Sequence, residues 1–131
     1  ANDWKGIYQL KPYPIYDAAK RLTSEMYIKG SFMCLSFHIK KPLKIGKGGM
    51  ILTDNEEAVK WLKKARYEGR TDGVSIYADD IDSLGWNMYM TPQQAAHGLA
   101  LMQNLADVNP DQPNNYRDLR TFKVFSKFKA L

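Results

Sequence analysis

Three short apolar runs stand out in the pattern of hydrophobic and polar positions, and each is bounded by glycine, proline or polar residues. They lie around residues 13–16, 31–37 and 49–53, and their length is typical of β-strands. The second and third runs lack alternation between polar and apolar residues. We therefore expect these two strands to be covered on both faces, as in a buried sheet.

An amphipathic helix is expected directly after the third run. Thr53 and Glu56 have the spacing of a capping box, in which two side chains bond the first backbone N–H groups. Asp54 and Glu57 offer the same box one residue later. Gly69 is placed to end this helix. The apolar stripe comprises Ala58, Val59, Leu62 and Ala65.

A second helix begins with strong signals. Thr91 is a favourable N-cap, Pro92 suits the first helical position, and Gln94 completes a capping box. Its predicted apolar face comprises Ala95, Leu99, Met102 and Leu105. We expect this helix to be interrupted by the polar and proline-containing segment 109–115.

The other segments complete an α/β pattern. Residues 71–84 are predicted to be a polar connection with a turn at Asp72-Gly73. An amphipathic pattern over residues 116–129 predicts a last helix. Its apolar positions are Leu119, Phe122, Phe125 and Phe128.

Composition narrows the class of protein. A chain of 131 residues with 44% hydrophobic residues is long enough for one compact domain with a core. The net charge is +5, but the basic residues are scattered and no zinc-finger or RNA-recognition signature accompanies them. Solvated faces and attraction for phosphorylated small molecules explain this charge, so we expect no nucleic-acid partner.

The chain contains neither an apolar stretch of membrane-spanning length nor a signal peptide, so no membrane partner is expected. Its single cysteine, Cys34, cannot form an internal disulfide, which favours a reducing compartment and a cytoplasmic location. Cys34 is interpreted as a buried structural thiol. His97 has no partner histidine on its helix, so no metal site is expected.

The clearest chemical motif joins the second run to a glycine-rich turn. Ser36 lies five residues before Lys41, and Gly46 follows five residues after that lysine. This spacing suits a lysine at the mouth of a strand, where its amine can capture a phosphorylated aldehyde as a Schiff base. A Lys-Lys pair in a solvated basic turn is the alternative interpretation, but Lys41 fits the motif and Lys40 does not.

The segment Ser36-Phe37-His38-x-x-Lys41, with Leu43, Gly46, Gly48 and Gly49, resembles the cofactor-lysine motif of the DegT/DnrJ/EryC1/StrS family. Three further segments are similar to family motifs: residues 15–20, 66–70 and 85–99. Together with the lysine motif they occur along the chain in the order in which the family has them. The chain departs from the family pattern at three positions. It has Lys47 where the family has an acidic residue, Glu68 where the family has histidine, and Tyr89 where the family has arginine. The resemblance implies a pyridoxal 5'-phosphate-dependent aminotransferase that acts on nucleotide-linked keto-sugars with an amino-acid donor.

The resemblance also implies roles for individual residues. Lys41 would bind the cofactor covalently, and Asp17 would contact the pyridine nitrogen. Ser36 would bind the cofactor phosphate, Lys20 would lie near the phenolic oxygen, and Asn87 would reach the phosphate of the neighbouring subunit. Without the motif, Ser36, Asp17 and Asn87 are also typical of strand-end and turn positions.

The implied fold is part of the large cofactor-binding domain of a fold-type-I aminotransferase, with a mainly parallel sheet flanked by helices. We expect residues 1–131 to form a single, truncated portion of that domain, without a separate small domain. We therefore expect the chain to form a homodimer and to be poorly active or inactive without the rest of the enzyme. The alternative is a non-catalytic domain that dimerises or binds a phosphorylated ligand.

Overall fold

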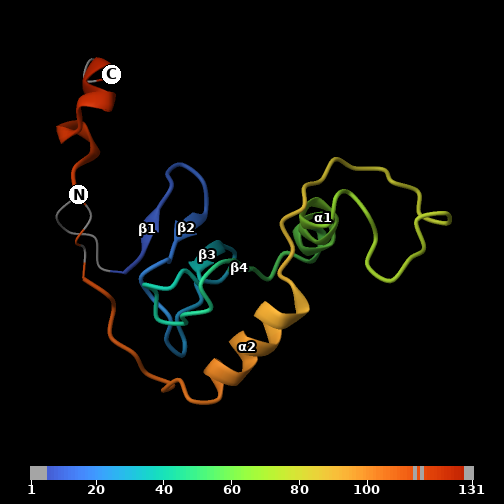
Figure 1. Ribbon diagram of the computed structural model, residues 1–131, viewed down its shortest axis with the longest axis horizontal. Coiled ribbons are helices and arrows are strands. Elements are labelled where there is room, and N and C mark those ends of the chain that lie inside the picture. Colours follow the sequence, from blue (N-terminus) through green and yellow to red (C-terminus); the bar gives the residue numbers. More distant parts are fainter. Residues whose placement is uncertain (1–5, 114, 116, 129–131) are drawn as a thin grey trace.

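A four-stranded sheet forms the centre of the computed structural model, which describes residues 6–113, 115 and 117–128 (Figure 1). The strands follow in chain order: β1 (Tyr8–Gln9), β2 (Ile15–Asp17), β3 (Phe32–Ser36) and β4 (Gly49–Leu52). The middle pair is parallel, whereas β1 pairs antiparallel with β2 and β4 pairs antiparallel with β3. The prediction of a mainly parallel sheet is therefore wrong for the described residues. The structure is an α/β arrangement with a mixed sheet.

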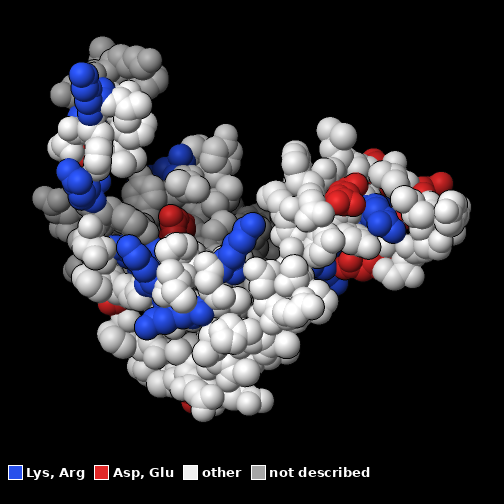
Figure 2. All heavy atoms as spheres, in the orientation of Figure 1, with Lys and Arg blue, Asp and Glu red and all other residues white. Residues whose placement is uncertain are grey.

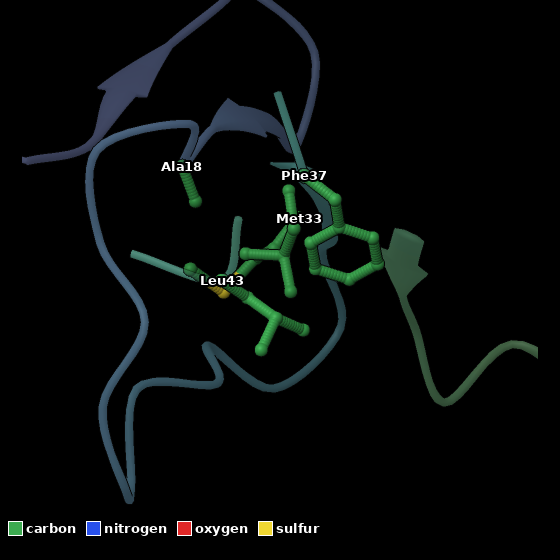
Figure 3. Close-up of a cluster of buried hydrophobic side chains, with 5 residues drawn as sticks. Ala18, Met33, Phe37 and Leu43 are labelled. Carbon is green, nitrogen blue, oxygen red and sulfur yellow. The ribbon is translucent and has the colours of Figure 1, made fainter. Parts of the chain in front are cut away.

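The core lies against one face of β3. Met33, Leu35 and Phe37 alternate with half-buried residues and pack with Ala18 and Leu43 (Figure 3). The expectation that β3 and β4 are covered on both faces is wrong, because β3 is fully buried on one face only. β4 forms an edge of the sheet, and its apolar side chains are mostly exposed.

Helix α1 (Glu56–Arg66) begins one or two residues later than either predicted cap. Asn55 is the N-cap, and its side-chain oxygen accepts a hydrogen bond from the Ala58 N–H at 2.9 Å. Asp54 does not cap the helix, because its carboxylate accepts a hydrogen bond from the Tyr27 hydroxyl at 2.8 Å. A tertiary contact thus decided between neighbouring residues that all favour helix N-termini.

Helix α2 (Pro92–Met102) confirms the predicted start, with both hydrogen bonds of the Thr91–Gln94 capping box present. Its predicted apolar face is wrong, because Leu99 and Met102 are exposed. Gly98 instead faces inward, where an added Cβ would meet the Ile45 side chain. The helix packs through Gly98 and the half-buried Leu101, since a glycine allows close approach to the Ile45 segment.

The connection between the two helices is irregular, as predicted, with a turn at Asp72-Gly73. Its two ends are tied together next to α1. The Trp86 N–H donates to the Ala65 carbonyl at 2.7 Å, and the Met88 N–H donates to the Arg66 carbonyl at 2.9 Å. This connection and α1 lie together at one side of the sheet (Figure 1).

The predicted last α-helix over residues 116–129 is replaced by two 3₁₀ segments, η1 (Leu119–Thr121) and η2 (Lys123–Phe128). Tyr116 and residue 129 lie outside the described residues. Leu119 and Phe125 are exposed, so the apolar pattern has little surface to pack against. Short helices are stabilised mainly by packing of their apolar face against the rest of the protein, so an amphipathic pattern alone did not produce an α-helix here. None of the described helices has the length and apolar content needed to cross a membrane.

Candidate functional site

The lysine motif forms a tight turn at the end of β3. The Lys41 N–H donates to the His38 carbonyl at 2.8 Å, and the Lys40 N–H donates to His38 Nδ1 at 3.2 Å. The turn separates the two neighbouring lysines: Lys41 is only 9% exposed, whereas Lys40 is exposed. Local backbone geometry therefore distinguishes the buried Lys41 from the exposed Lys40.

The glycine-rich turn holds the lysine turn against the sheet. The Phe37 N–H donates to the Gly48 carbonyl, and the Gly46 N–H donates to the Phe37 carbonyl, each at 2.9 Å. Gly46 and Gly48 have φ angles of 107° and 99°, a region that side chains with a Cβ rarely adopt. Leu43 comes between the lysine turn and the glycine-rich turn in the sequence. Its buried side chain belongs to the core and anchors this segment there.

A cavity of about 640 Å³ opens beside the lysine turn. Its lining is rich in basic and amide side chains and, among the described residues, includes no acidic one: Lys20, Ser36, His38, Lys40, Lys41, Gln112, Pro113 and Asn115. Figure 2 shows Lys and Arg side chains on the face over the sheet, while acidic side chains gather mainly over α1 and the connection that follows it. The volume lies in the range of small-molecule sites.

Three of the five predicted site residues meet in this cavity. Ser36 ends β3, Lys41 follows in the turn, and Lys20 comes from the loop after β2. Lys20 is 3% exposed, and its Nζ donates to the Pro113 carbonyl at 2.5 Å. The structure therefore brings two buried lysine side chains and one hydroxyl to the same cavity wall.

Asp17 is not among the residues that line the cavity. It ends β2 opposite Cys34, so Asp17, Cys34 and Ser36 share one face of the sheet. The Asp17 carboxylate accepts a hydrogen bond from the Ala19 N–H at 2.9 Å. Burial, and secondly the negative charge of Asp17, raise the pKa of the Cys34 thiol, which keeps it protonated at neutral pH. Cys34 is half-buried, whereas a buried thiol was expected from the sequence.

Asn87 lies elsewhere, in the connection beside α1. Its side-chain amide donates to the Glu68 carboxylate at 2.9 Å, and its backbone pairs with Tyr67. Tyr89 packs edge-on against the Tyr67 ring, with 5.2 Å between ring centroids. Two of the departures from the family pattern, Glu68 and Tyr89, therefore lie together in the neighbourhood of Asn87.

The contribution of Gln112, Pro113 and Asn115 to the cavity was not predicted from the sequence. Their segment was expected only to interrupt the preceding helix. The Gln112 side-chain amide donates to the Lys40 carbonyl at 3.0 Å across 72 residues of sequence, and the Gln112 N–H donates to the Lys20 carbonyl at 2.9 Å. No local pattern carries a contact between residues so far apart in the chain.

The residues that meet here fit a phosphorylated carbonyl compound such as pyridoxal 5'-phosphate. A buried lysine amine can bond an aldehyde carbon, and a hydroxyl with surrounding cations can bind a phosphate. A metal ion has less to bind, since His, Cys, Asp and Glu form no cluster of three or more within the described part of the chain.

Comparisons with known proteins found a matching family model and two partial relatives. The model of the DegT/DnrJ/EryC1/StrS aminotransferase family matches residues 15–121. An uncharacterized protein of Methanocaldococcus jannaschii is 32% identical over 99 residues, which cover 66% of this chain and 26% of that protein. The spore coat polysaccharide biosynthesis protein SpsC of Bacillus subtilis is 32% identical over 87 residues, or 60% of this chain and 22% of SpsC. The chain thus spans about a quarter of the length of these relatives. No solved structure matches significantly.

Proposed function

The chain belongs to the DegT/DnrJ/EryC1/StrS aminotransferase family, and from this premise we propose that its lysine cavity holds pyridoxal 5'-phosphate for amino transfer. The proposed reaction moves an amino group from an amino-acid donor to a nucleotide-linked keto-sugar. The observation that carries the proposal is the burial of Lys41 in a cavity that Ser36 and Lys20 also line. When bound, the cofactor would supply an electron sink for negative charge on the substrate carbon.

Lys41 is the residue that would bind the cofactor covalently. It lies in the cavity wall at the end of a turn closed by the His38 carbonyl, so its position is fixed from the backbone. When substrate replaces it, the released Lys41 amine could carry a proton to or from the substrate carbon. The exposed Lys40 lacks this confinement and would act as a cation beside the phosphate.

The phosphate would bind at the end of β3. The Ser36 hydroxyl can donate a hydrogen bond to a phosphate oxygen, and the neighbouring lysine ammonium groups can bind its charge. Lys20 would hold the phenolic oxygen of the cofactor ring from the opposite loop. The absence of acidic residues from the described lining supports an anionic ligand.

Asp17 would hold the pyridine nitrogen in its protonated form. β2 and β3 are parallel, so Asp17 and Ser36 lie at the carboxyl ends of neighbouring strands on the same edge of the sheet. Ligands in α/β folds bind outside this edge. This strand-end position supports a role for Asp17 at the site. Asp17 is nevertheless not among the residues that line the cavity of a single copy of the chain.

The substrate class rests on the family and on one relative. SpsC carries a name that refers to spore coat polysaccharide biosynthesis, which supports a sugar as the amino acceptor. Phosphate groups of a nucleotide-linked sugar would suit a cavity lined by basic side chains.

Asn87 would act in a second copy of the chain, so we propose a homodimer. Within one copy Asn87 bonds Glu68 and does not line the cavity. A single copy would then have an incomplete phosphate site and be poorly active or inactive. The exposed Leu84, Trp86 and Met88 around Asn87 supply apolar surface for such a contact.

A non-catalytic role is the second candidate. Asp17 lies outside the described lining of the cavity, and without a carboxylate at the pyridine nitrogen the cavity would bind a phosphorylated ligand but would not support amino transfer. In that case pyridoxal 5'-phosphate would bind reversibly, with no requirement for Lys41.

Borohydride reduction after addition of pyridoxal 5'-phosphate, followed by peptide mass mapping, separates the two candidates. Amino transfer predicts a stable adduct on Lys41 that disappears in Lys41→Ala and persists in the matched variant Lys40→Ala. An adduct on Lys40 that survives in Lys41→Ala would contradict the assignment. Phosphate binding without any adduct in the unmodified chain would favour the non-catalytic role.

A further inference from the structure

Residues 107–113 form a strap along the loop that follows β2. At one end the Ser24 N–H donates to the Asp107 carbonyl at 2.7 Å, and the Asn109 side-chain amide donates to the Leu22 carbonyl at 3.0 Å. Further on, Arg21 binds Asp111 through two hydrogen bonds of 2.7 and 2.6 Å. The strap is therefore attached to this loop by side chains and by backbone groups at successive positions. In Figure 1 it is the segment that runs from α2 past the sheet.

The strap ends at the lysine cavity, where Gln112 bridges two loops. Its backbone N–H donates to the Lys20 carbonyl at 2.9 Å, and its side-chain amide donates to the Lys40 carbonyl at 3.0 Å. The Lys40 carbonyl and the Lys41 N–H belong to the same peptide group. That N–H donates to the His38 carbonyl at 2.8 Å, so both polar atoms of this peptide group are held.

We propose that Gln112 is a positioning residue for Lys41, because its side chain fixes the peptide group from which the lysine side chain departs. The inference rests on the proposed function for the role of Lys41 and deepens it. Rotation of this peptide group would turn the Lys41 Cα–Cβ bond, and Gln112 opposes that rotation from outside the turn. Gln112 also joins the Lys41 turn to the Lys20 loop, so the spacing of the two buried lysines depends on it.

The charged anchor at Asp111 explains why a single glutamine can act in this way. A bidentate pair of arginine and carboxylate fixes orientation as well as distance. With Arg21 and Asp111 only about a quarter exposed, at 26% and 28%, the pair is shielded from full solvent screening. Gln112 follows Asp111 directly, so the anchor limits where its side chain can reach.

The first test removes the donor while keeping the length of the side chain. Gln112→Met, in the full chain without cofactor, should raise the hydrogen-exchange rate of the Lys41 amide roughly fivefold, as expected for one lost hydrogen bond. Gln103→Met is the matched control, because Gln103 is an exposed residue at the end of α2 and should leave Lys41 unchanged. Equal Lys41 exchange in Gln112→Met and Gln103→Met would overturn the proposal.

The amide of Met33 in the core serves as the reference for overall unfolding. Positioning predicts faster exchange at Lys41 with Met33 unchanged, whereas a proportional rise at both would show a merely structural role and overturn the proposal. If Gln112→Met does not fold, Asp111→Asn can be used instead, because it weakens the ion pair with Arg21. The exchange rates of the Lys41 and Met33 amides are then compared in the same way. A Lys41 rate unchanged in Asp111→Asn would then count against the proposal.

A second readout uses the cofactor. After pyridoxal 5'-phosphate and borohydride, Gln112→Met should lower the ratio of adduct on Lys41 to adduct on Lys40, again with Gln103→Met as the control. An unchanged ratio would contradict positioning. If the unmodified chain forms no adduct, the proposed function fails, while the amide exchange of Lys41 still decides the role of Gln112.

Discussion

Residues 6–53, the sheet region, bury Met33, Leu35, Phe37 and their neighbours in one cluster, whereas residues 55–88, the α1 region, bury little apolar surface. Among the described residues of the α1 region, Ala65 is the one buried apolar side chain. Larger apolar side chains of the α1 region are mostly exposed: Trp61, Ile76, Tyr77, Ile81, Leu84, Trp86 and Met88. The sheet region is thus held by a core, and the α1 region is held mainly by hydrogen bonds.

The two regions also differ in charge. The sheet region has eight Lys and Arg residues against two acidic residues, and the α1 region has five against seven. In the α1 region the charges are paired across the connection, with Lys64 to Asp82 at 2.7 Å and Arg66 to Asp72 at 2.8 Å. In the sheet region, basic side chains line a cavity that includes no described acidic residue. The two regions therefore differ in charge at the surface, and the cavity proposed to bind an anionic ligand lies in the basic one.

The largest expected effect comes from the core of the sheet region. Met33 is 0% exposed, so Met33→Ala should lower the free energy of unfolding by about 2–5 kcal/mol through lost burial and a residual cavity. Trp61→Ala is the counterpart in the α1 region, where the side chain is 54% exposed, and should change it by less than about 1 kcal/mol. Urea unfolding measures both. A larger effect of Trp61→Ala would reverse the comparison.

The next prediction concerns the start of α1. Asn55→Ala removes the side-chain oxygen that accepts from the Ala58 N–H and should destabilise the helix by about 1 kcal/mol. Because the α1 region has little core, hydrogen exchange should rise within α1 while the Met33 amide stays unchanged. Thr53→Ala is the control for the cap that the sequence predicted and should have a smaller effect on α1. Equal acceleration in α1 and β3 would show that the two regions unfold together.

A smaller, pH-dependent effect is expected at the strap. The hydrogen bond from Arg21, and its positive charge, lower the pKa of Asp111, although partial burial opposes this. A carboxyl group with a lowered folded-state pKa contributes stability above its unfolded pKa, near 4, and that contribution is lost as the pH falls through the folded-state value. Asp111→Asn should therefore be less stable than the unmodified chain at pH 6 by up to about 1 kcal/mol, with the difference shrinking below pH 4.

Glu57→Gln is the matched control for Asp111→Asn, because Glu57 pairs with Lys60 on the exposed surface of α1. Glu57→Gln should change the free energy of unfolding at pH 6 by less than Asp111→Asn does, because its ion pair is exposed to solvent. A difference for Asp111→Asn that grows toward acid would contradict the sign of the argument.

The smallest effect on stability should come from Leu84 in the α1 region. Its side chain is 84% exposed, so Leu84→Ser should change the free energy of unfolding by no more than about 0.5 kcal/mol. Self-association measured by light scattering should nevertheless weaken, because the proposed contact around Asn87 uses this apolar surface. Unchanged association would remove Leu84 from that contact.

Features that depend on neighbouring residues were determined by the sequence itself. The Thr91–Gln94 capping box, the strand ends at Asp17 and Ser36, and the turn in which the Lys41 N–H donates to the His38 carbonyl each need only a short segment. Local hydrogen bonds of this kind follow from the sequence unless a tertiary contact takes one of the side chains, as Tyr27 takes Asp54 at the start of α1.

Only the tertiary structure decided the features that join distant segments. The sheet is mixed because the turn segment 37–48 returns the chain antiparallel to β3, whereas the longer loop after β2 allows a parallel pair. Gly98, which lies close to Ile45, determines the inward face of α2, and Leu119 and Phe125 of the last predicted helix remain exposed. Gln112 reaches Lys40 across 72 residues, because folding supplies the Arg21–Asp111 anchor that brings the strap to the cavity. Such contacts depend on where whole segments pack, and no local pattern of residues encodes that placement.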